Sequence, residues 1–218
     1  ITSSIDYGTG ATDIDRNTYK SVIIGEQEWM AENLRTIKYS DGTAITNVTD
    51  DTEWANDITG AWCHYDNDNQ YDTIYGKLYN WYAVETGKLC PTGWHVPTDA
   101  EWTVLEEYLT ANGHSGAEGT ALKATSGWDY DGNGTDDYGW NGLPGMSRGI
   151  IKSVAADGAD ALGIFVLSYN GFWWSSSEES TSVALYRVLA GGTGLVIGIG
   201  DDGGGHKENG YSVRCLRD

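Results

Sequence analysis

Side chains with oxygen atoms occupy every second position along residues 129–135 of the segment DYDGNGTDD (129–137). In this sequence, these residue types at this spacing are the best candidates for binding a metal ion. Oxygen ligands at every second position, with a glycine that permits a sharp turn, are typical of the first half of an EF-hand-like calcium loop. The twelfth position is Trp140 rather than Glu, so the closing bidentate ligand would have to come from elsewhere. The same run is also ordinary turn chemistry, which is the alternative. The expected ligands of a weak, extracellular-grade calcium site are Asp129, Asp131, Asn133, Thr135 and Asp137.

Catalytic motifs are not recognisable in the rest of the sequence. No GxSxG, HExxH or P-loop pattern occurs, and the four histidines share no spacing. The 32 acidic residues are too many for a catalytic pair to be singled out. His95, between Trp94 and Val96, is expected to be a packed, hydrogen-bonded structural residue. We therefore predict that the protein is not an enzyme.

Charge and hydropathy limit the possible partners. The formal net charge of −19 argues against nucleic acid and against anionic membrane surfaces. No apolar run approaches transmembrane length, so we expect no membrane insertion. The three cysteines match no zinc pattern. Residues 1–11 are expected to be a leader or linker and residues 12–218 a single domain.

Hydrophobic periodicity predicts the elements that would position these residues. Residues 18–24 and 27–34 indicate a hairpin, with Gly25 in its turn. Residues 75–84 carry apolar side chains at helical spacing and predict a first helix. A second helix is expected over residues 98–111, because Thr98 and Glu101 form a capping-box pair.

The remaining segments indicate ordered loops and a β-rich C-terminal part. Residues 46–73 and 113–171 show no strong periodicity and are expected to be long ordered loops. Strands are expected over 171–178, 184–189 and 211–216. In the last of these, alternation would place Tyr211, Val213 and Cys215 on one face, and it would bury only one of Trp173 and Trp174. The order of elements predicts an α+β fold.

Six phrases recur in this order in one known family. They are GEQEWMAENLR (25–35), YGKLYNWYAV (75–84), GWHVPTDAEW (93–102), GNGTDDYGW (132–140), WWSSSE (173–178) and GYSVRCLRD (210–218). On these phrases the chain resembles the Fibrobacter succinogenes major paralogous domain, a family of bacterial exported proteins. HVPTDAEW and GYSVRC are also similar, more distantly, to phrases of formylglycine-generating-type domains. The copper-binding cysteine pair of those enzymes is not matched, so their activity is not expected.

The resemblance implies a C-type-lectin-like fold. In that fold two helices pack on small antiparallel sheets, a long irregular loop region follows, and the N- and C-terminal strands pair. A cysteine between the helices commonly bridges to one in the last strand, and Cys90 and Cys215 stand at those two places. The alternative is two buried thiols. With the bridge formed, Cys63 would be unpaired.

The resemblance also implies where a ligand would bind, because such folds bind through the long loop region and the strand beside it. The Glu-Pro-Asn type triplet of calcium-dependent sugar-binding lectins is absent, so sugar binding through calcium is not expected. The candidate ligand-binding residues are Trp173, Ser175, Ser177, Glu178, Arg187, Asp201, Asp202, His206 and Lys207.

The glycine-rich run 190–205 (AGGTGLVIGIGDDGGG) leaves two interpretations open. One is a strand over residues 195–199 with flexible flanks, pairing beside residues 184–189. The other is a variable recognition surface, since some proteins of this fold are diversified by retroelements in this region.

Together these features predict a non-catalytic binding or adhesion module, secreted by a bacterium or held on its cell surface. Its ligand would be an extracellular protein or a glycan. One alternative is a structural subunit or tip component of a surface filament or large adhesin. Another is the diversified receptor of a diversity-generating retroelement.

Overall fold

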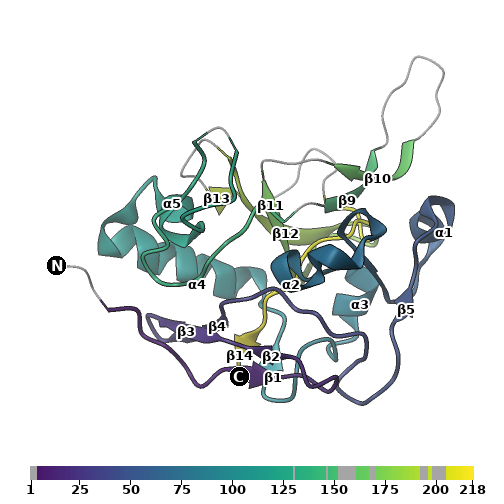
Figure 1. Cartoon of the computed structure of the whole chain (residues 1–218), viewed down its shortest axis with the longest axis horizontal. Coiled ribbons are helices and arrows are strands. Elements are labelled where there is room, and N and C mark those ends of the chain that lie inside the picture. The colour runs from purple at the N-terminus through teal and green to yellow at the C-terminus, as the bar shows by residue number, and fades with distance from the viewer. Residues whose placement is uncertain are drawn as a thin grey trace.

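The structure, a computed structural model, describes residues 4–129, 131–145, 147–151, 161–166, 170–191, 196–197 and 205–218. Within these ranges it combines short helices with several small sheets, which confirms the predicted α+β class (Figure 1). The helices are α1 (Asp51–Asn56), α2 (Asp72–Tyr75), α3 (Trp81–Glu85), α4 (Asp99–Leu109) and α5 (Glu118–Leu122). No helix in the described ranges is both long enough and apolar enough to cross a membrane.

Three sheets have more than two strands in the described part of the chain. The first has the order β3 (Ser21–Ile24), β4 (Gln27–Met30), β14 (Leu216–Arg217) and β8 (Trp94–His95). The second is formed by β5 (Thr46–Asn47), β6 (Ala61–His64) and β7 (Lys77–Tyr79). The third is formed by β11 (Gly171–Glu178), β12 (Ala184–Leu189) and β13 (Val196–Ile197). Two antiparallel pairs are β1 (Ala11–Thr12) with β2 (Thr18–Tyr19), and β9 (Ser147–Ile151) with β10 (Ala161–Val166).

The predicted N-terminal hairpin is confirmed as β3 and β4. Ser21 pairs with Met30 and Ile24 with Gln27, while Gly25 in the turn has φ of 65°. This left-handed conformation suits glycine because it has no Cβ. Strand β4 ends at Met30, so the predicted extension to residue 34 is not strand. Residues 4–8, expected to belong to a leader, run beside β3, where Tyr7 bridges to Val22.

The predicted second helix is confirmed as α4. The Thr98 hydroxyl accepts a hydrogen bond from the Glu101 backbone N–H (3.3 Å), and the Glu101 carboxylate accepts one from the Thr98 N–H (2.7 Å). These two bonds satisfy backbone donors that every helix start leaves free. Trp102, Leu105 and Leu109 form its buried face. The helix turns into a π-type segment after Leu109, and Gly113 within that segment adopts φ of 95°.

The prediction of one helix over residues 75–84 is wrong. The segment contains the end of α2, the strand β7 and the start of α3. Gly76 breaks the helix because it adopts φ of 72°, and a Cβ there would lie 2.8 Å from the Leu34 carbonyl oxygen. Asn80 then caps α3 with its side chain. The helical spacing of apolar residues arises because Leu78 and Tyr79 pack into two different clusters.

The two segments predicted as loops contain regular structure. Residues 46–73 include α1 and β6, and residues 113–171 include α5 and the paired strands β9 and β10. These elements have at most six residues, too few for a periodic pattern to stand out. Helix α1 begins after Asp50, whose side chain accepts from the Glu53 N–H. The prediction of irregular loops there is therefore wrong in part.

The C-terminal segment 211–217 lies between the two large hydrophobic clusters. Tyr211, Val213 and Cys215 all belong to the first cluster, which confirms the predicted alternation. Leu216 belongs to the second and pairs with Trp29 of β4 and His95 of β8. The segment therefore joins the first strands of the chain to the helix region.

The prediction that only one of Trp173 and Trp174 is buried is wrong. Both are fully buried, Trp173 in the second cluster and Trp174 in the first. Strand β11 has core on both of its faces, so alternation places the two indoles in different cores rather than one in solvent. Each indole N–H is satisfied, Trp173 by the Asn33 side chain and Trp174 by the Tyr79 carbonyl.

Cys90 and Cys215 form the expected disulfide, and Cys63 is a buried free thiol. The bridge closes a stretch of 125 residues. In the chain-entropy model a crosslink of this span contributes about 4–5 kcal/mol by restricting the unfolded chain. Burial raises the pKa of the Cys63 thiol to about 12, so the thiolate is not formed near neutral pH.

We predict one titratable thiol when the denatured protein is assayed without reductant, and three after reduction. The native protein should show none, because Cys63 is 0% exposed. Replacing both Cys90 and Cys215 with Ala should lower the free energy of unfolding in urea by up to about 5 kcal/mol. Three thiols before reduction would contradict the pairing.

His95 connects the C-terminus to the start of α4. Its Nδ1 lies 2.8 Å from an Asp218 carboxylate oxygen and its Nε2 lies 2.9 Å from a Glu101 oxygen. Both nitrogens can donate only when the ring is protonated. Burial lowers the pKa of His95, but the hydrogen bonds to Asp218 and Glu101 outweigh it and leave this pKa raised. The predicted structural role of His95 agrees with this geometry.

We predict that the free energy of unfolding falls as pH rises above about 6.5 and through the folded-state pKa of His95, which is raised. A His whose pKa is raised on folding contributes stability below its unfolded pKa of about 6.5, and that contribution is lost as pH passes the folded pKa. His64 acts in the opposite direction and mainly at lower pH, because burial lowers its pKa. A His95→Gln variant should lose the decline in urea titrations across this range. An identical decline in that variant would show that other groups cause it.

Candidate functional site

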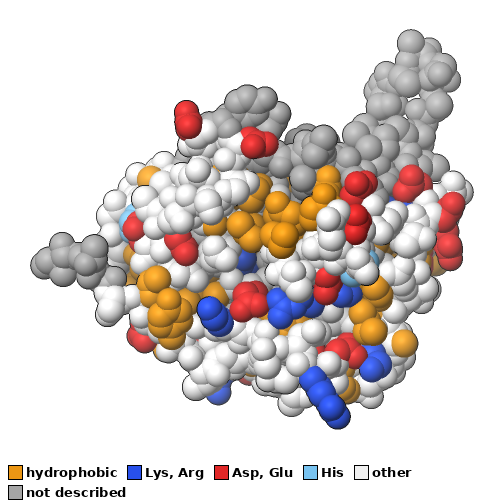
Figure 2. Space-filling model, viewed as in Figure 1, with side chains coloured by type: hydrophobic (Ala, Val, Ile, Leu, Met, Phe, Trp, Pro, Cys, Tyr) orange, Lys and Arg blue, Asp and Glu red, His pale blue; other side chains and the backbone are white. Residues whose placement is uncertain are grey.

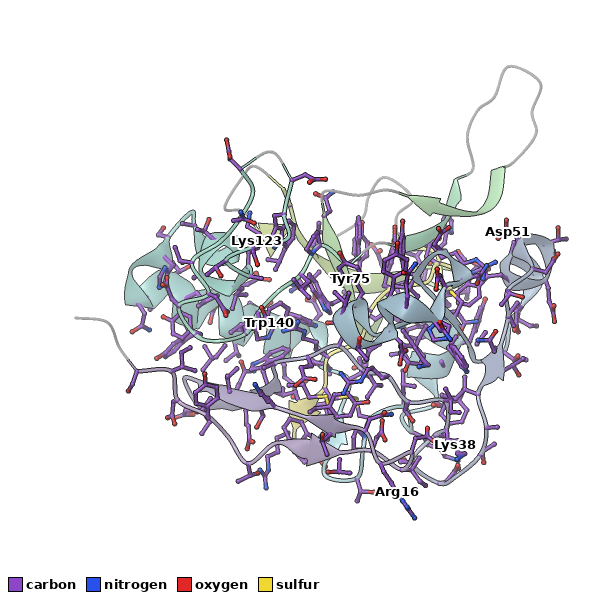
Figure 3. The ribbon with its side chains drawn as sticks, viewed as in Figure 1. Arg16, Lys38, Asp51, Tyr75, Lys123 and Trp140 are labelled. Carbon is purple, nitrogen blue, oxygen red and sulfur yellow. A yellow bond between two sulfur atoms is a disulfide. The ribbon has the colours of Figure 1, made fainter. Side chains whose placement is uncertain are left out.

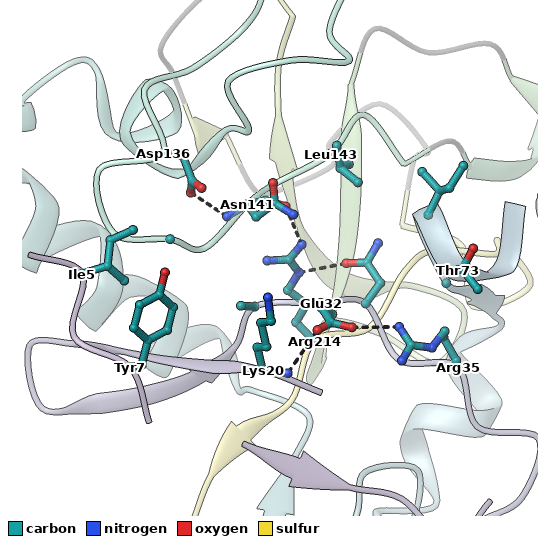
Figure 4. Close-up of a pocket in the computed structure, with 15 residues that line it drawn as sticks. Ile5, Tyr7, Lys20, Glu32, Arg35, Thr73, Asp136, Asn141, Leu143 and Arg214 are labelled. Carbon is teal, nitrogen blue, oxygen red and sulfur yellow. Dashed lines mark hydrogen bonds and ion pairs between the residues drawn. The ribbon is translucent and has the colours of Figure 1, made fainter. Parts of the chain in front are cut away.

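A cavity of about 400 Å³ opens where six separated parts of the chain meet (Figure 4). They are the N-terminal residues 5–7, Lys20 before the first hairpin, residues 31–35 after it, the C-terminal part of α2 with Gly76, the turn 136–143 and the C-terminal segment. The lining residues that carry polar or charged side chains are Tyr7, Lys20, Glu32, Asn33, Arg35, Thr73, Asp136, Asn141 and Arg214. In Figure 2 cationic and anionic side chains gather across the middle of this face, below a hydrophobic area. The cavity is therefore polar and carries charges of both signs.

The upper wall of the cavity is a tight turn whose shape follows from its residue types. Asp136, Gly139 and Asn141 have φ of 49°, 69° and 53°. Asp, Gly and Asn are the residues that adopt this left-handed region most readily. The Asp136 carboxylate closes the turn by accepting from the Asn141 backbone N–H at 2.7 Å. Burial raises the pKa of Asp136, although this bond and the charge of Arg214 oppose the rise.

Arg214 forms the floor of the cavity, and only 1% of it is exposed. Its Nε donates to the Asn33 side-chain oxygen at 2.8 Å, Nη1 donates to the Trp140 carbonyl, and Nη2 donates to the Asn141 carbonyl at 2.9 Å. Its guanidinium carbon also lies 3.8 Å from the centre of the Trp140 indole, which gives a cation–π contact. Figure 3 shows Trp140 in the interior between α4 and the first sheet. Arg214 thus ties the 136–143 turn to the last segment.

The other cations of the cavity lie at its rim. Arg35 Nη1 pairs with the Glu32 carboxylate at 2.9 Å, and the Lys20 backbone N–H donates to the same carboxylate at 3.1 Å. Burial lowers the pKa of Arg214 to about 9, while Asp136 and Glu32 oppose this. The group therefore keeps its charge at neutral pH. The hydrogen bonds of Arg214 hold its side chain in place. An anionic group can therefore bind in the cavity without a change in the position of Arg214.

Three of the predicted calcium ligands make hydrogen bonds within their own segment. No group of three His, Cys, Asp or Glu side chains suited to a metal is found within those ranges. Asn133 accepts from the Trp128 N–H at 3.0 Å, and the Thr135 hydroxyl donates to Asp137 at 2.8 Å. Asp129 and Asp131 are exposed on the same turn. Calcium binding by this loop stays a prediction.

Four predicted ligand-binding residues lie in the interior, so placing them on a binding surface is wrong. Trp173 and Ser175 are fully buried in β11. Arg187 is 4% exposed and pairs with Asp99 (2.5 Å) and Glu106 (2.6 Å) of α4. Lys207 is also 4% exposed and pairs with Glu178 at 2.5 Å. These side chains hold β11, β12 and α4 together because buried charges need partners.

The remaining predicted residues are scattered. Ser177 accepts from the Asp99 backbone N–H at 3.0 Å, and His206 is half-buried. Asp201 and Asp202 lie outside the described residues. Within the predicted strand 195–199, Val196–Ile197 do pair with β12, as expected, and the other positions lie outside the described residues.

Sequence reasoning missed the cavity around Arg214. Its lining residues come from parts of the chain as far apart as Ile5 and Arg214, and no motif joins them. One signal was available: Arg214 stands in a strand whose alternate residues were expected to be core. A charged residue in such a strand must be buried or must face a polar cavity.

The fold and the site together define a small disulfide-bonded α+β domain with a polar cavity beside its C-terminal segment. The sequence profile of the Fibrobacter succinogenes major domain (Fib_succ_major) matches residues 22–217, and the chain belongs to this family. Comparison with curated proteins and with solved structures gives no match.

We predict that Arg214→Met lowers the free energy of unfolding by about 2–4 kcal/mol, because it leaves the Trp140 and Asn141 carbonyls without a donor. Arg217→Met is the matched control. Arg217 is largely exposed and pairs with Glu28 at 2.8 Å, so its loss should cost less than about 1 kcal/mol. Urea unfolding of the two variants measures the difference. Equal losses would contradict the structural role given to Arg214.

Proposed function

We propose that this domain is a non-catalytic binding or adhesion module that recognises a protein or glycan ligand through the cavity around Arg214. One observation carries the proposal: a polar cavity of about 400 Å³ whose floor is a buried cation held by three hydrogen bonds. A rigid concave site with a few fixed polar groups is typical of ligand recognition. The cavity includes the 136–143 turn and Arg214, so it draws on the loop region and the C-terminal segment.

We also propose that the fold is C-type-lectin-like. Three features support this interpretation. The first hairpin pairs with the last strand through Trp29 and Leu216. Helices α3 and α4 come before the loop region in the chain. Cys90, between these helices, is bridged to Cys215.

We further propose that a bacterium secretes the domain or carries it on its surface. The disulfide supports this location, because such bonds persist mainly in oxidising, extracytoplasmic compartments. A calcium ion on the 129–137 turn would suit the millimolar calcium found outside cells. This part of the proposal is separate from the cavity, since Asp129 and Asp131 do not line it.

We predict that the domain retains ligands from glycan or protein arrays and that Lys20→Glu abolishes this retention. The exposed Lys20 lines the cavity, so a reversed charge there repels the bound group with little effect on folding. Lys88→Glu is the matched control, because Lys88 is exposed and lies away from the cavity. Comparing retention on arrays run with about 1 mM calcium and on arrays run with a chelator shows whether binding requires calcium.

Retention that is equal in the Lys20 and Lys88 variants would mean that the ligand site lies elsewhere. No retention at all, together with assembly of the protein at high concentration, would favour a structural subunit of a filament or adhesin instead.

A further inference from the structure

We infer that the cavity takes the carboxylate of an acidic sugar residue, with Arg214 and Lys20 as its cationic partners. The inference rests on the proposed binding function and names the ligand chemistry of the same site. It starts from a buried cation that forms no direct ion pair with a described carboxylate.

Four of the other buried cations each pair with a carboxylate. Arg148 pairs with Asp51 at 2.6 Å, Lys77 pairs with Asp72 at 2.5 Å, and Arg187 and Lys207 have the carboxylate partners described above. Arg214 forms no ion pair with any described Asp or Glu. A buried cation without a carboxylate is unfavourable unless other groups compensate for it. An anion that enters the cavity would supply the missing partner.

The guanidinium has donors left for such an anion. It carries five N–H groups, and Asn33, Trp140 and Asn141 accept from three of them, which leaves two within the described structure. A carboxylate has two oxygens that fit the two outer nitrogens of an Arg side chain. Two unused donors on a side chain at the floor of an open cavity favour a carboxylate ligand over a neutral one.

Lys20 supplies a second positive charge at the rim of the cavity. Figure 4 shows its side chain extending from the hairpin toward Arg214. Its amino group forms no ion pair with a described carboxylate, whereas Glu32 beside it is already paired with Arg35. Asp136 is the remaining acidic group of the cavity, and its burial disfavours its charged form. The local charge at the entrance is therefore more positive than the net charge of −19 suggests.

The rest of the lining favours a sugar ring. Thr73 and Asn141 offer a hydroxyl and an amide that suit sugar hydroxyl groups. Tyr7 is 62% exposed at the rim, so one face of its ring is open to stack on a pyranose. Ile5 and Ile74 line the same cavity and suit the apolar face of such a ring. A volume of about 400 Å³ lies at the small end for ligand sites, which fits one or two rings.

The test compares acidic sugars with their neutral parents by calorimetry at constant ionic strength. D-Galacturonate and D-glucuronate are titrated beside D-galactose and D-glucose, so that sugar stereochemistry is matched. Each acid should bind at least about 10-fold more tightly than its parent, as expected for one charge-assisted contact. Lys20→Gln should weaken the acid about 3-fold to 5-fold and Asp136→Asn should strengthen it about 2-fold. Lys88→Gln should change nothing.

Equal affinity for acid and parent, or equal effects of Lys20→Gln and Lys88→Gln, would overturn the inference. So would tighter binding of N-acetylglycine, a carboxylate without a sugar ring, because the cavity would then be selecting a peptide-like group. The array result is independent of these outcomes. Uronate binding without array retention would refute the adhesion module and leave this inference standing. Array retention of neutral glycans alone would support the adhesion module and refute this inference.

Discussion

The fold depends on the burial of its last strand-like segment between two hydrophobic clusters. Tyr211, Val213 and Cys215 pack into one cluster and Leu216 into the other. Isolated bridges join Tyr211 to Tyr79 of β7 and Ser212 to Trp173 of β11, so three sheets meet along seven residues. The disulfide fixes this segment to the turn before β8. Since short sheets of two to four strands are weakly stable alone, the shared segment makes them one cooperative unit.

Burial of this segment on both sides also determines what its polar residues can do. Ser212 and Arg214 alternate with the core residues and are 0% and 1% exposed. The Ser212 hydroxyl accepts from Asn33 at 3.2 Å, and the same Asn33 accepts from Arg214 and from Trp173. Asn33 is therefore the centre of a polar layer between the two clusters. This layer ends at the cavity, which is why the site lies beside the last segment.

Local sequence signals predicted the elements whose own residues determine them. The β3–β4 hairpin follows from a glycine turn between β-branched and aromatic residues, and α4 follows from its capping box and buried face. The Cys90–Cys215 bridge followed from the family resemblance, because spacing alone does not select a partner among three cysteines. The prediction for residues 75–84 was wrong because Gly76 breaks the helix, and because Leu78 and Tyr79, which stand at helical spacing from Tyr75, pack into different clusters. The prediction that only one of Trp173 and Trp174 is buried was wrong for another reason. Alternation shows which face of the strand a side chain lies on, but it does not show whether that face is exposed to solvent.

The cavity could not be predicted for a different reason. The residues that line it become neighbours only after Asn33 and the 136–143 turn have packed on the C-terminal segment. In the sequence, Arg214 is only a single charged residue in a predicted strand, and nothing there indicates a cavity beside it. An apolar side chain at this position would leave the Trp140 and Asn141 carbonyls without a donor. Arg214 therefore has two roles in one geometry: it holds the scaffold with three donors, and it lines the open cavity without a direct ion pair to a described carboxylate.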